Sequence, residues 1–214
     1  MTRSTVSPVP RRTQEQRSQE MRTRLQDATI DCLVEYGYAG ATTPRIAERA
    51  GVTRGAQVHH FGSKAELMTA AISRLAQRRI EAAMQELGRV QVSSDSVAGV
   101  LDFLWELHQG PLFIASVELW VASRTDPALA TELKKVEPYV NNAVLLGLSR
   151  FTPDEVDRKD AEAFLYTAMD ALRGILLSAF VDDDPERAHR RWRRACRDLH
   201  HAGEAALSGR PVTD

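Results

Sequence analysis

An all-α fold of about nine helices is predicted for this chain of 214 residues, and three observations lead to that prediction. Helix-forming Ala, Leu, Glu, Gln and Arg recur throughout the sequence. Alternation of apolar and polar residues, the pattern of a half-buried strand, is not sustained anywhere. Gly and Pro stand at intervals suited to the ends of helices. A hydrophobic content of 43% and a charged content of 27% are ordinary for a folded soluble protein.

The N-terminal part is expected to contain a short tail and one helix. Residues 1–16 mix Ser, Thr, Pro and Arg without periodicity, which predicts a disordered basic arm. From residue 17 onward apolar side chains recur on one face of a helix that should end at Gly37. These side chains are Leu25, Ala28, Cys32, Leu33 and Tyr36.

Two short helices should follow, over residues 44–50 and 54–60, with Gly51 in the turn between them. Thr42 or Thr43 is expected to cap the first helix, and Thr53 the second. Ser63 and Glu66 have the spacing of a capping box, which predicts a long fourth helix reaching towards residue 87.

Five further helices are expected, and Pro or Gly marks most of their boundaries. Their ranges are 95–109, 111–124, 127–150, 154–181 and 185–208. Pro138 lies inside the third of these ranges, where it should kink or break the helix. We find no internal repeat.

Charge and cysteine content limit the possible classes of protein. The formal net charge is −1, but basic residues outnumber acidic ones over residues 1–64, as expected of a segment that faces phosphates. The first 20 residues lack the apolar core of a signal peptide, and we see no run of 18 apolar residues, so a cytoplasmic protein without membrane contact is expected. Cys32 and Cys196 are isolated and should be reduced thiols. No metal-ligand cluster or cofactor motif is present.

The stretch from Thr42 to Lys64 fits a helix-turn-helix. Ala47 allows the two short helices to approach closely, and Gly51 accepts the backbone angle of the turn. The second helix would enter the major groove of double-stranded DNA, where Arg pairs with guanine and Gln with adenine. Gln57 would either read a base or be satisfied inside the domain. The candidate DNA-contacting residues are Thr43, Arg45, Thr53, Arg54, Gly55, Gln57, His59, His60 and Lys64.

The residues of this stretch resemble the DNA-binding domain of the tetracycline-repressor (TetR) family. The resemblance rests on Tyr36-Gly37-Tyr38, on the run from Ala41 to Gly55, and on His59-His60-Phe61-Gly62-Ser63-Lys64-Ala65-Glu66-Leu67, and it covers about residues 20–70. The sequence departs from the family pattern at Gln57, where an apolar residue is usual, and at Val58, where a phosphate-contacting tyrosine is usual. The resemblance implies a helix-turn-helix domain over 17–65 and a helical ligand-binding and dimerisation domain over 66–210.

The helix expected over 111–124 is apolar almost all round, as a central helix should be. It forms part of a core, and it could also line a pocket for a small-molecule effector. The candidate pocket residues are Leu101, Leu104, Trp105, His108, Phe113, Val117, Glu118, Trp120, Tyr139 and Phe164. Glu118 is the charge inside the apolar run, and we expect it to pair with a buried arginine such as Arg173 in preference to contacting a ligand.

The last two helices each carry a narrow apolar stripe with small residues. One stripe is Ala161, Leu165, Ala168, Leu172, Leu176 and Ala179, and the other is Ala188, Trp192, Ala195, Leu199, Ala202 and Ala206. The family resemblance implies a homodimer built from these helices, although one stripe could serve the intramolecular core. A dimer would present two recognition helices to a palindromic site.

These observations predict a ligand-responsive dimeric transcriptional regulator, most simply a repressor that a small molecule releases from its operator. A regulator controlled by a partner protein, or an activator, is the alternative. An enzyme is the weakest reading, because no nucleophile and base have a recognisable pairing in the sequence.

Overall fold

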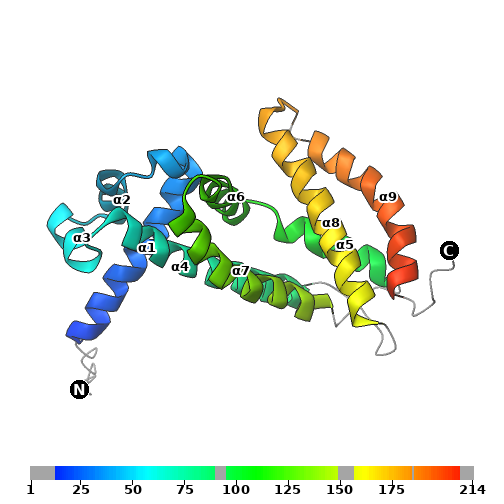
Figure 1. The fold of residues 1–214 in the computed structure, drawn as a ribbon, viewed down its shortest axis with the longest axis horizontal. Coiled ribbons are helices and arrows are strands. Elements are labelled where there is room, and N and C mark those ends of the chain that lie inside the picture. Colours follow the sequence, from blue (N-terminus) through cyan, green and yellow to red (C-terminus); the bar gives the residue numbers. More distant parts are fainter. Residues whose placement is uncertain (1–12, 90–94, 149–156, 185, 208–214) are drawn as a thin grey trace, which may run out of the picture.

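The computed structural model describes residues 13–89, 95–148, 157–184 and 186–207. Within these ranges the chain forms nine α-helices, a single 3₁₀ turn and no strand, so the predicted all-α class is confirmed (Figure 1). The elements are α1 (Gln14–Gly40), α2 (Thr43–Ala50), α3 (Arg54–His60), α4 (Lys64–Arg89), α5 (Ser96–Leu107), α6 (Pro111–Ser123), α7 (Pro127–Leu148), α8 (Arg158–Ser178), η1 (Ala179–Val181) and α9 (Arg187–Leu207).

Local capping explains most helix boundaries. Helix α1 begins at Gln14, inside the range expected to be a disordered arm, because Thr13 and Gln16 form a reciprocal capping box. Residues 1–12 of that arm lie outside the described residues. Gly37 interrupts α1 at φ 67°, where the helix was expected to end. Helix α7 runs unbroken through Pro138, so the expected break is absent.

Two hydrophobic clusters hold the helices together. One joins α1, α2 and the first half of α4 to α6 and the start of α7. The other joins the end of α4 to α5, α8 and α9, with Trp192 and Phe103 among its fully buried side chains. Helices α4 and α7 lie side by side along the molecule and bridge the two regions (Figure 1). The N-terminal helices therefore share a core with α6, so they are not packed as an isolated unit.

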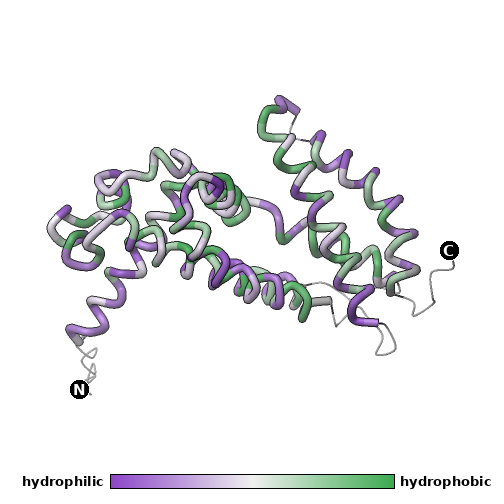
Figure 2. The backbone as a smooth tube through the Cα atoms, in the orientation of Figure 1, coloured by the Kyte–Doolittle hydropathy of each residue, from purple (hydrophilic) through white to green (hydrophobic). Residues whose placement is uncertain are grey.

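The apolar stripe predicted on α8 faces the interior of the protomer. Ala161, Leu165, Ala168 and Leu172 are buried in the second cluster, and Ala188 and Trp192 of the α9 stripe join them there. The α8 stripe therefore serves the intramolecular core, the alternative that the spacing had left open for one stripe, whereas the α9 stripe is buried only in part and its Ala202 is exposed. Figure 2 shows hydrophobic residues along much of α8, and Tyr166 and Leu177 on this helix are exposed.

The segment Arg158–Val181 is long and apolar enough, by length and composition alone, to cross a membrane. The expectation that no segment of the chain has this property is therefore wrong. Core helices of soluble proteins pass the same test, and the inner face of α8 is such a core face. Only 33% of the apolar window is buried within the protomer, so much of this helix surface lacks a covering element in a single copy.

Candidate functional site: a nucleic-acid interface and an interior cavity

Helices α2 and α3 form the predicted helix-turn-helix. Gly51 ends α2 in the left-handed conformation (φ 63°, ψ 40°), which reverses the chain without a Cβ clash. The Thr53 hydroxyl accepts a hydrogen bond from the Ala56 N–H (3.2 Å) and starts α3. Arg54 and Gly55 follow in the first exposed turn. The N-terminal end of α3 thus offers one long cationic side chain beside a residue that leaves room for a closely approaching duplex.

Arg45 lies on the exposed surface of the neighbouring helix α2. Its Nη1 donates to the Gly40 carbonyl oxygen (2.9 Å), and its guanidinium lies 4.5 Å from the centre of the Tyr36 ring. These contacts hold the side chain against the end of α1 while leaving it open to solvent. Thr43, half-buried at the start of α2, and His59, exposed on α3, complete the predicted set on this side.

Gln57 does not belong to the exposed surface of α2 and α3 that carries the predicted DNA-contacting residues, here called the reading surface. Its side chain is 2% exposed, and its Nε2 donates to the Phe61 carbonyl oxygen at 3.0 Å. The inclusion of Gln57 among the DNA-contacting residues is therefore wrong for this structure, and the alternative of internal satisfaction fits. The amide takes the place of the family's apolar residue because it satisfies the carbonyl at the end of α3. Val58 stands exposed on the other side of the helix.

His60 and Lys64 are tied to the protein. His60 is half-buried, and burial, reinforced by the neighbouring His59 and Arg22, lowers its pKa. The His60 carbonyl oxygen accepts a hydrogen bond from Arg22 Nη1 (2.9 Å). Lys64 Nζ donates to the Tyr38 carbonyl oxygen (3.2 Å) and lies 5.1 Å from the centre of the Tyr38 ring. In the free protein both residues fasten the module together.

Tyr38 is the point where the N-terminal module meets the body. Its N–H donates to Glu118 Oε2 (3.0 Å), and its hydroxyl donates to Asp126 Oδ2 (2.9 Å). Burial, together with the bond to Asp126, raises the pKa of Tyr38 to about 12. The expected pairing of Glu118 with Arg173 is therefore wrong. Because Gly37 interrupts α1, the Tyr38 N–H lies near a broken helix end, and Glu118 of α6 supplies its acceptor.

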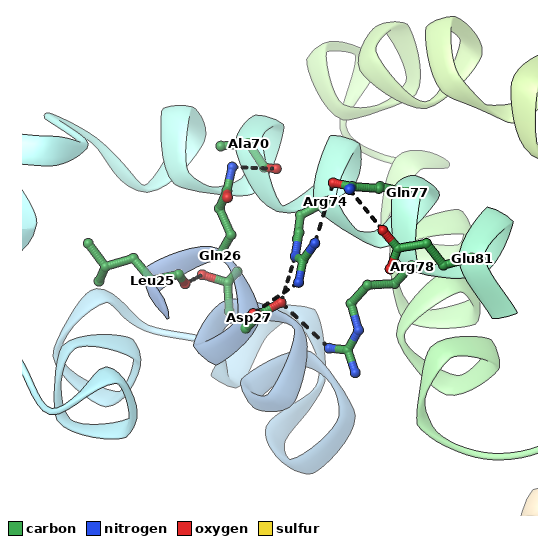
Figure 3. Close-up of polar contacts among 9 residues, drawn as sticks. Leu25, Gln26, Asp27, Ala70, Arg74, Gln77, Arg78 and Glu81 are labelled. Atoms are coloured by element: carbon green, nitrogen blue, oxygen red, sulfur yellow. Dashed lines mark hydrogen bonds and ion pairs between the residues drawn. The ribbon is translucent and has the colours of Figure 1, made fainter. Parts of the chain in front are cut away.

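A second polar connection joins α1 to α4 (Figure 3). Asp27 accepts hydrogen bonds from Arg74 Nε (2.9 Å) and Nη2 (3.3 Å), and Arg78 Nη1 lies 3.7 Å away. Gln26 Nε2 donates to the Ala70 carbonyl oxygen (3.3 Å). A bidentate arginine–carboxylate pair fixes direction as well as distance. Helix α1 is thus attached firmly to the first half of α4.

An interior cavity lies between α4, α5, α6, α7 and α8. It holds about 20 Å³, enough for roughly one water molecule, whereas pockets for organic ligands run to about 300–1,000 Å³. Its lining residues are Arg79, Ala82, Leu107, His108, Leu112, Phe113, Val140, Val144, Met169 and Arg173. Among the predicted pocket residues, His108 and Phe113 line it.

The other predicted pocket residues lie elsewhere. Leu101, Leu104 and Phe164 are core residues, and Val117 is buried on α6. Trp105 stacks on His189 in an open surface groove between α5 and α9, and Tyr139 is exposed. Glu118 binds the Tyr38 N–H. Trp120 lies beside the cavity, where two arginines approach its ring.

Arg79 and Arg173 are these two arginines, and both line the cavity although neither was among the predicted pocket residues. Arg79 Nη1 donates to Glu137 Oε1 (3.0 Å), an oxygen that also accepts from Trp120 Nε1 (3.1 Å). Burial lowers the pKa of both Arg79 and Arg173. The spacing along α4 could have shown that Arg79 lies on the buried face of this helix, because it stands four residues from Leu75 and from Ala83, and Leu87 continues the series.

His108 is the third polar side chain of the lining. Burial, with a further contribution from the charges of Arg173 and Arg79, lowers its pKa to about 4. The ring is therefore neutral at pH 7, and Nδ1 lies 2.8 Å from the Leu104 carbonyl oxygen. A carbonyl only accepts, so Nδ1 carries the proton and Nε2 keeps a lone pair. Among residues 13–89, 95–148, 157–184 and 186–207 no group of three or more His, Cys, Asp or Glu side chains is placed to hold a metal ion.

Comparison with known proteins agrees with this architecture. Residues 25–71 match the family model of the bacterial regulatory proteins of the tetR family. The HTH-type transcriptional regulator CymR of Pseudomonas putida is 32% identical over 183 residues, covering 84% of this chain and 89% of CymR. The HTH-type transcriptional repressor AcnR of Corynebacterium diphtheriae is 30% identical over 161 residues, covering 73% of this chain and 80% of AcnR.

A solved structure shares the fold. The crystal structure of a transcriptional regulator from Rhodococcus sp. Rha1 has a TM-score of 0.63 at 22% identity, and the match covers 90% of this chain and 99% of that one. The matched segment of the family model contains α2, α3 and the Tyr38 junction, and the CymR match extends through most of the body. The chain therefore belongs to the TetR family and is a helix-turn-helix transcriptional regulator, not an enzyme.

Proposed function

We propose that this chain is a cytoplasmic, dimeric repressor that binds a palindromic operator and releases it when a small molecule enters the interior cavity. The observation that carries the proposal is the course of α4. This helix begins at Lys64, shortly after the recognition helix α3, and carries Arg79 into the cavity lining. One rigid element therefore connects the reading surface with the cavity. The relative AcnR is named a transcriptional repressor, which supports repression over activation.

Two sets of contacts support mechanical coupling. The Asp27–Arg74 pair attaches α1 to α4, and Glu118 attaches α6 to the Tyr38 N–H. Helix α6 also supplies Phe113 to the cavity wall. A ligand that separates α6 from α4 would therefore pull on the N-terminal module from two sides. Such a ligand changes operator affinity by its preference for one of the two conformations.

The outward face of α8 supports the dimer. Tyr166 and Leu177 are exposed on it, and Phe180 and Val181 of η1 extend the apolar surface. A Cβ added at Gly174 would meet nothing within 4 Å, so the middle of this face is open and is formed by a residue without a side chain. Exposed apolar area of this kind marks an interaction surface, and small residues permit close helix packing. The simplest partner for this apolar surface is the α8–α9 pair of a second copy of the chain.

DNA binding is tested by fluorescence anisotropy with the DNA upstream of the protein's own reading frame, over a series of salt concentrations. Arg54→Ala should weaken binding about 5- to 150-fold, the value of one good side-chain contact with a base. Arg158→Ala changes another exposed arginine, on α8, and is the control that should change little. No sequence preference, or equal effects of the two variants, would contradict the proposed reading surface.

The dimer is tested by analytical ultracentrifugation. Leu177→Glu places a charge on the proposed interface and should shift the protein to monomer. Val121→Glu changes an exposed apolar residue of α6 and should leave the dimer intact. A wild-type monomer at micromolar concentration, or dissociation by both variants, would contradict this interface.

A further inference from the structure

The cavity has an unusual electrostatic composition for a space with mostly apolar walls. Its lining consists of apolar side chains apart from Arg79, Arg173 and His108. His108 is neutral, because burial and the two arginines lower its pKa. The charged groups that face the cavity are therefore both cations, although their side chains are largely buried, at 15% and 21% exposed.

Only Arg79 has a well-placed anion. Glu137 Oε1 lies 3.0 Å from Arg79 Nη1, and the same oxygen accepts the Trp120 indole N–H. The pair is shielded from solvent, so its charges largely cancel. The charge of Glu137 also acts on Arg173 and partly offsets the lowering of its pKa by burial, but one carboxylate cannot neutralise two guanidinium groups.

Arg173 has weak partners. The carboxylate of Asp170 lies 3.7 Å from Nη1, but the Asp170 side chain is 76% exposed, so water screens its charge. Nη2 lies 3.8 Å from the Met169 sulfur, a weak acceptor. Nε is buried and has no hydrogen-bond partner among the described residues. The guanidinium lies 5.0 Å from the centre of the Trp120 ring, which leaves its in-plane donors for another group.

A buried donor without an acceptor is costly, and such a donor in a folded protein calls for a partner such as a water molecule, an ion or a ligand. Guanidinium groups bind carboxylates through two parallel hydrogen bonds. The two arginines and Glu137 leave one positive charge in excess, which matches a monoanion better than a phosphate dianion.

We infer that the effector of this regulator is a small carboxylate with an apolar body, whose anionic group binds Arg173 with support from Arg79. This inference rests on the proposed function, in which the cavity is the effector site. Leu112, Phe113 and Met169 would contact the apolar body. The cavity must widen to admit it, and α7 has a place to bend, because Pro138 next to Glu137 removes a hydrogen bond of the helix.

The test is isothermal titration calorimetry of the full-length chain with matched probes. Benzoate and hexanoate are compared with benzamide and hexanamide, which keep the shape and lose the charge, and with benzylamine, which reverses it. At least one carboxylate should bind more than tenfold more tightly than its amide, and benzylamine should not bind. Equal affinity of acid and amide, or no carboxylate binding up to about 10 mM, would overturn the inference.

Three variants locate the anion. Arg173→Met should weaken carboxylate binding at least tenfold, and Arg158→Met on the exposed side of the same helix should not. Arg173→Lys keeps the charge and should keep the preference for acid over amide. Glu137→Gln removes the competing carboxylate and should tighten binding, an effect that a merely structural role would not produce. Carboxylate binding that survives Arg173→Met would overturn the assignment.

Operator release by the same probes separates the two proposals. A carboxylate that binds through Arg173 but leaves operator affinity unchanged would contradict the proposed effector control and keep the inferred ligand class. An operator that benzamide or benzylamine releases, while the carboxylates do not bind, would support effector control and overturn the ligand class.

Discussion

Replacing Arg173 by Met should make the ligand-free protein more stable, although it removes a charged side chain. Methionine has a stem of similar length, so the substitution leaves little empty space beside Trp120. It removes the buried Nε–H that lacks an acceptor and the charge that burial opposes. Replacing a poorly satisfied buried ion by an apolar side chain is often neutral or stabilising.

The expected gain follows from three contributions. An unsatisfied buried donor costs about 1–3 kcal/mol, which the substitution recovers. The exposed contact with Asp170 contributes about 0.2–1 kcal/mol, which is lost. The approach of the guanidinium to the Trp120 ring contributes about 0.5–1 kcal/mol, and a methionine sulfur restores part of it. The balance favours the variant by about 1 kcal/mol, or about 2–4 °C in melting temperature for a chain of this size.

Urea unfolding followed by circular dichroism measures this difference, with both proteins at the same concentration because the proposed dimerisation would also contribute to stability. Arg158→Met, an exposed change on the same helix, should stay within about 0.5 kcal/mol of the wild type. A loss of more than about 1 kcal/mol in Arg173→Met would mean that the guanidinium is well partnered. Arg173 would then have no need of a ligand carboxylate, which would contradict the inferred effector class.

Three further substitutions test the site. Gln57→Met should keep operator affinity within about threefold and cost at most about 1 kcal/mol, because the amide only serves the Phe61 carbonyl; a tenfold loss of affinity in the anisotropy assay would instead place Gln57 on a base. Glu118→Ala should lower the free energy of unfolding by about 1–3 kcal/mol by orphaning the Tyr38 N–H, and Glu118→Gln should recover most of it in urea titrations; equal losses would show that the charge matters, not the hydrogen bond. The pKa of His108 falls from 6.5 to about 4 on folding, so folding favours the neutral ring. The free energy of unfolding should therefore be constant above pH 6.5 and should decrease as the pH falls towards 4, by roughly 3 kcal/mol in total. His108→Gln should flatten this part of the stability–pH curve, and an unchanged curve would refute the assignment.

The helix-turn-helix was predictable because its signals are local. Gly51 fixes the turn through its own backbone angle, and Thr53 caps α3, which begins at the next residue. The start of α1 was placed three residues late, although Thr13 and Gln16 have capping-box spacing. Gln57 was left undecided because its acceptor, the Phe61 carbonyl, becomes accessible only when α3 ends there.

The cavity was not predictable in the same way, because its walls come from five helices separated by up to about a hundred residues. Spacing along one helix identifies a buried face but not what lies opposite. The α8 stripe through Leu165 and Leu172 was correctly read as a packing surface, yet it faces the protomer's own core. Glu118 was read as charged and buried, and only the fold could show that a backbone N–H, not Arg173, is its partner.

Helix α6 is short, and this gives the Glu118 contact a place in the proposed effector control. Its first turn supplies Leu112 and Phe113 to the cavity wall, and Glu118 follows on the next turns with its carboxylate on the Tyr38 N–H. Tyr38 is held at its hydroxyl by Asp126 and at its carbonyl by Lys64, the first residue of α4. A helix transmits displacement as a nearly rigid rod, so a ligand that moves the start of α6 must either carry Tyr38 with it or break the Glu118 bond. In the first case the recognition helix is displaced, and in the second the module is loosened. Either outcome would lower the affinity for the proposed palindromic operator, to which a dimer would present two recognition helices at a fixed separation.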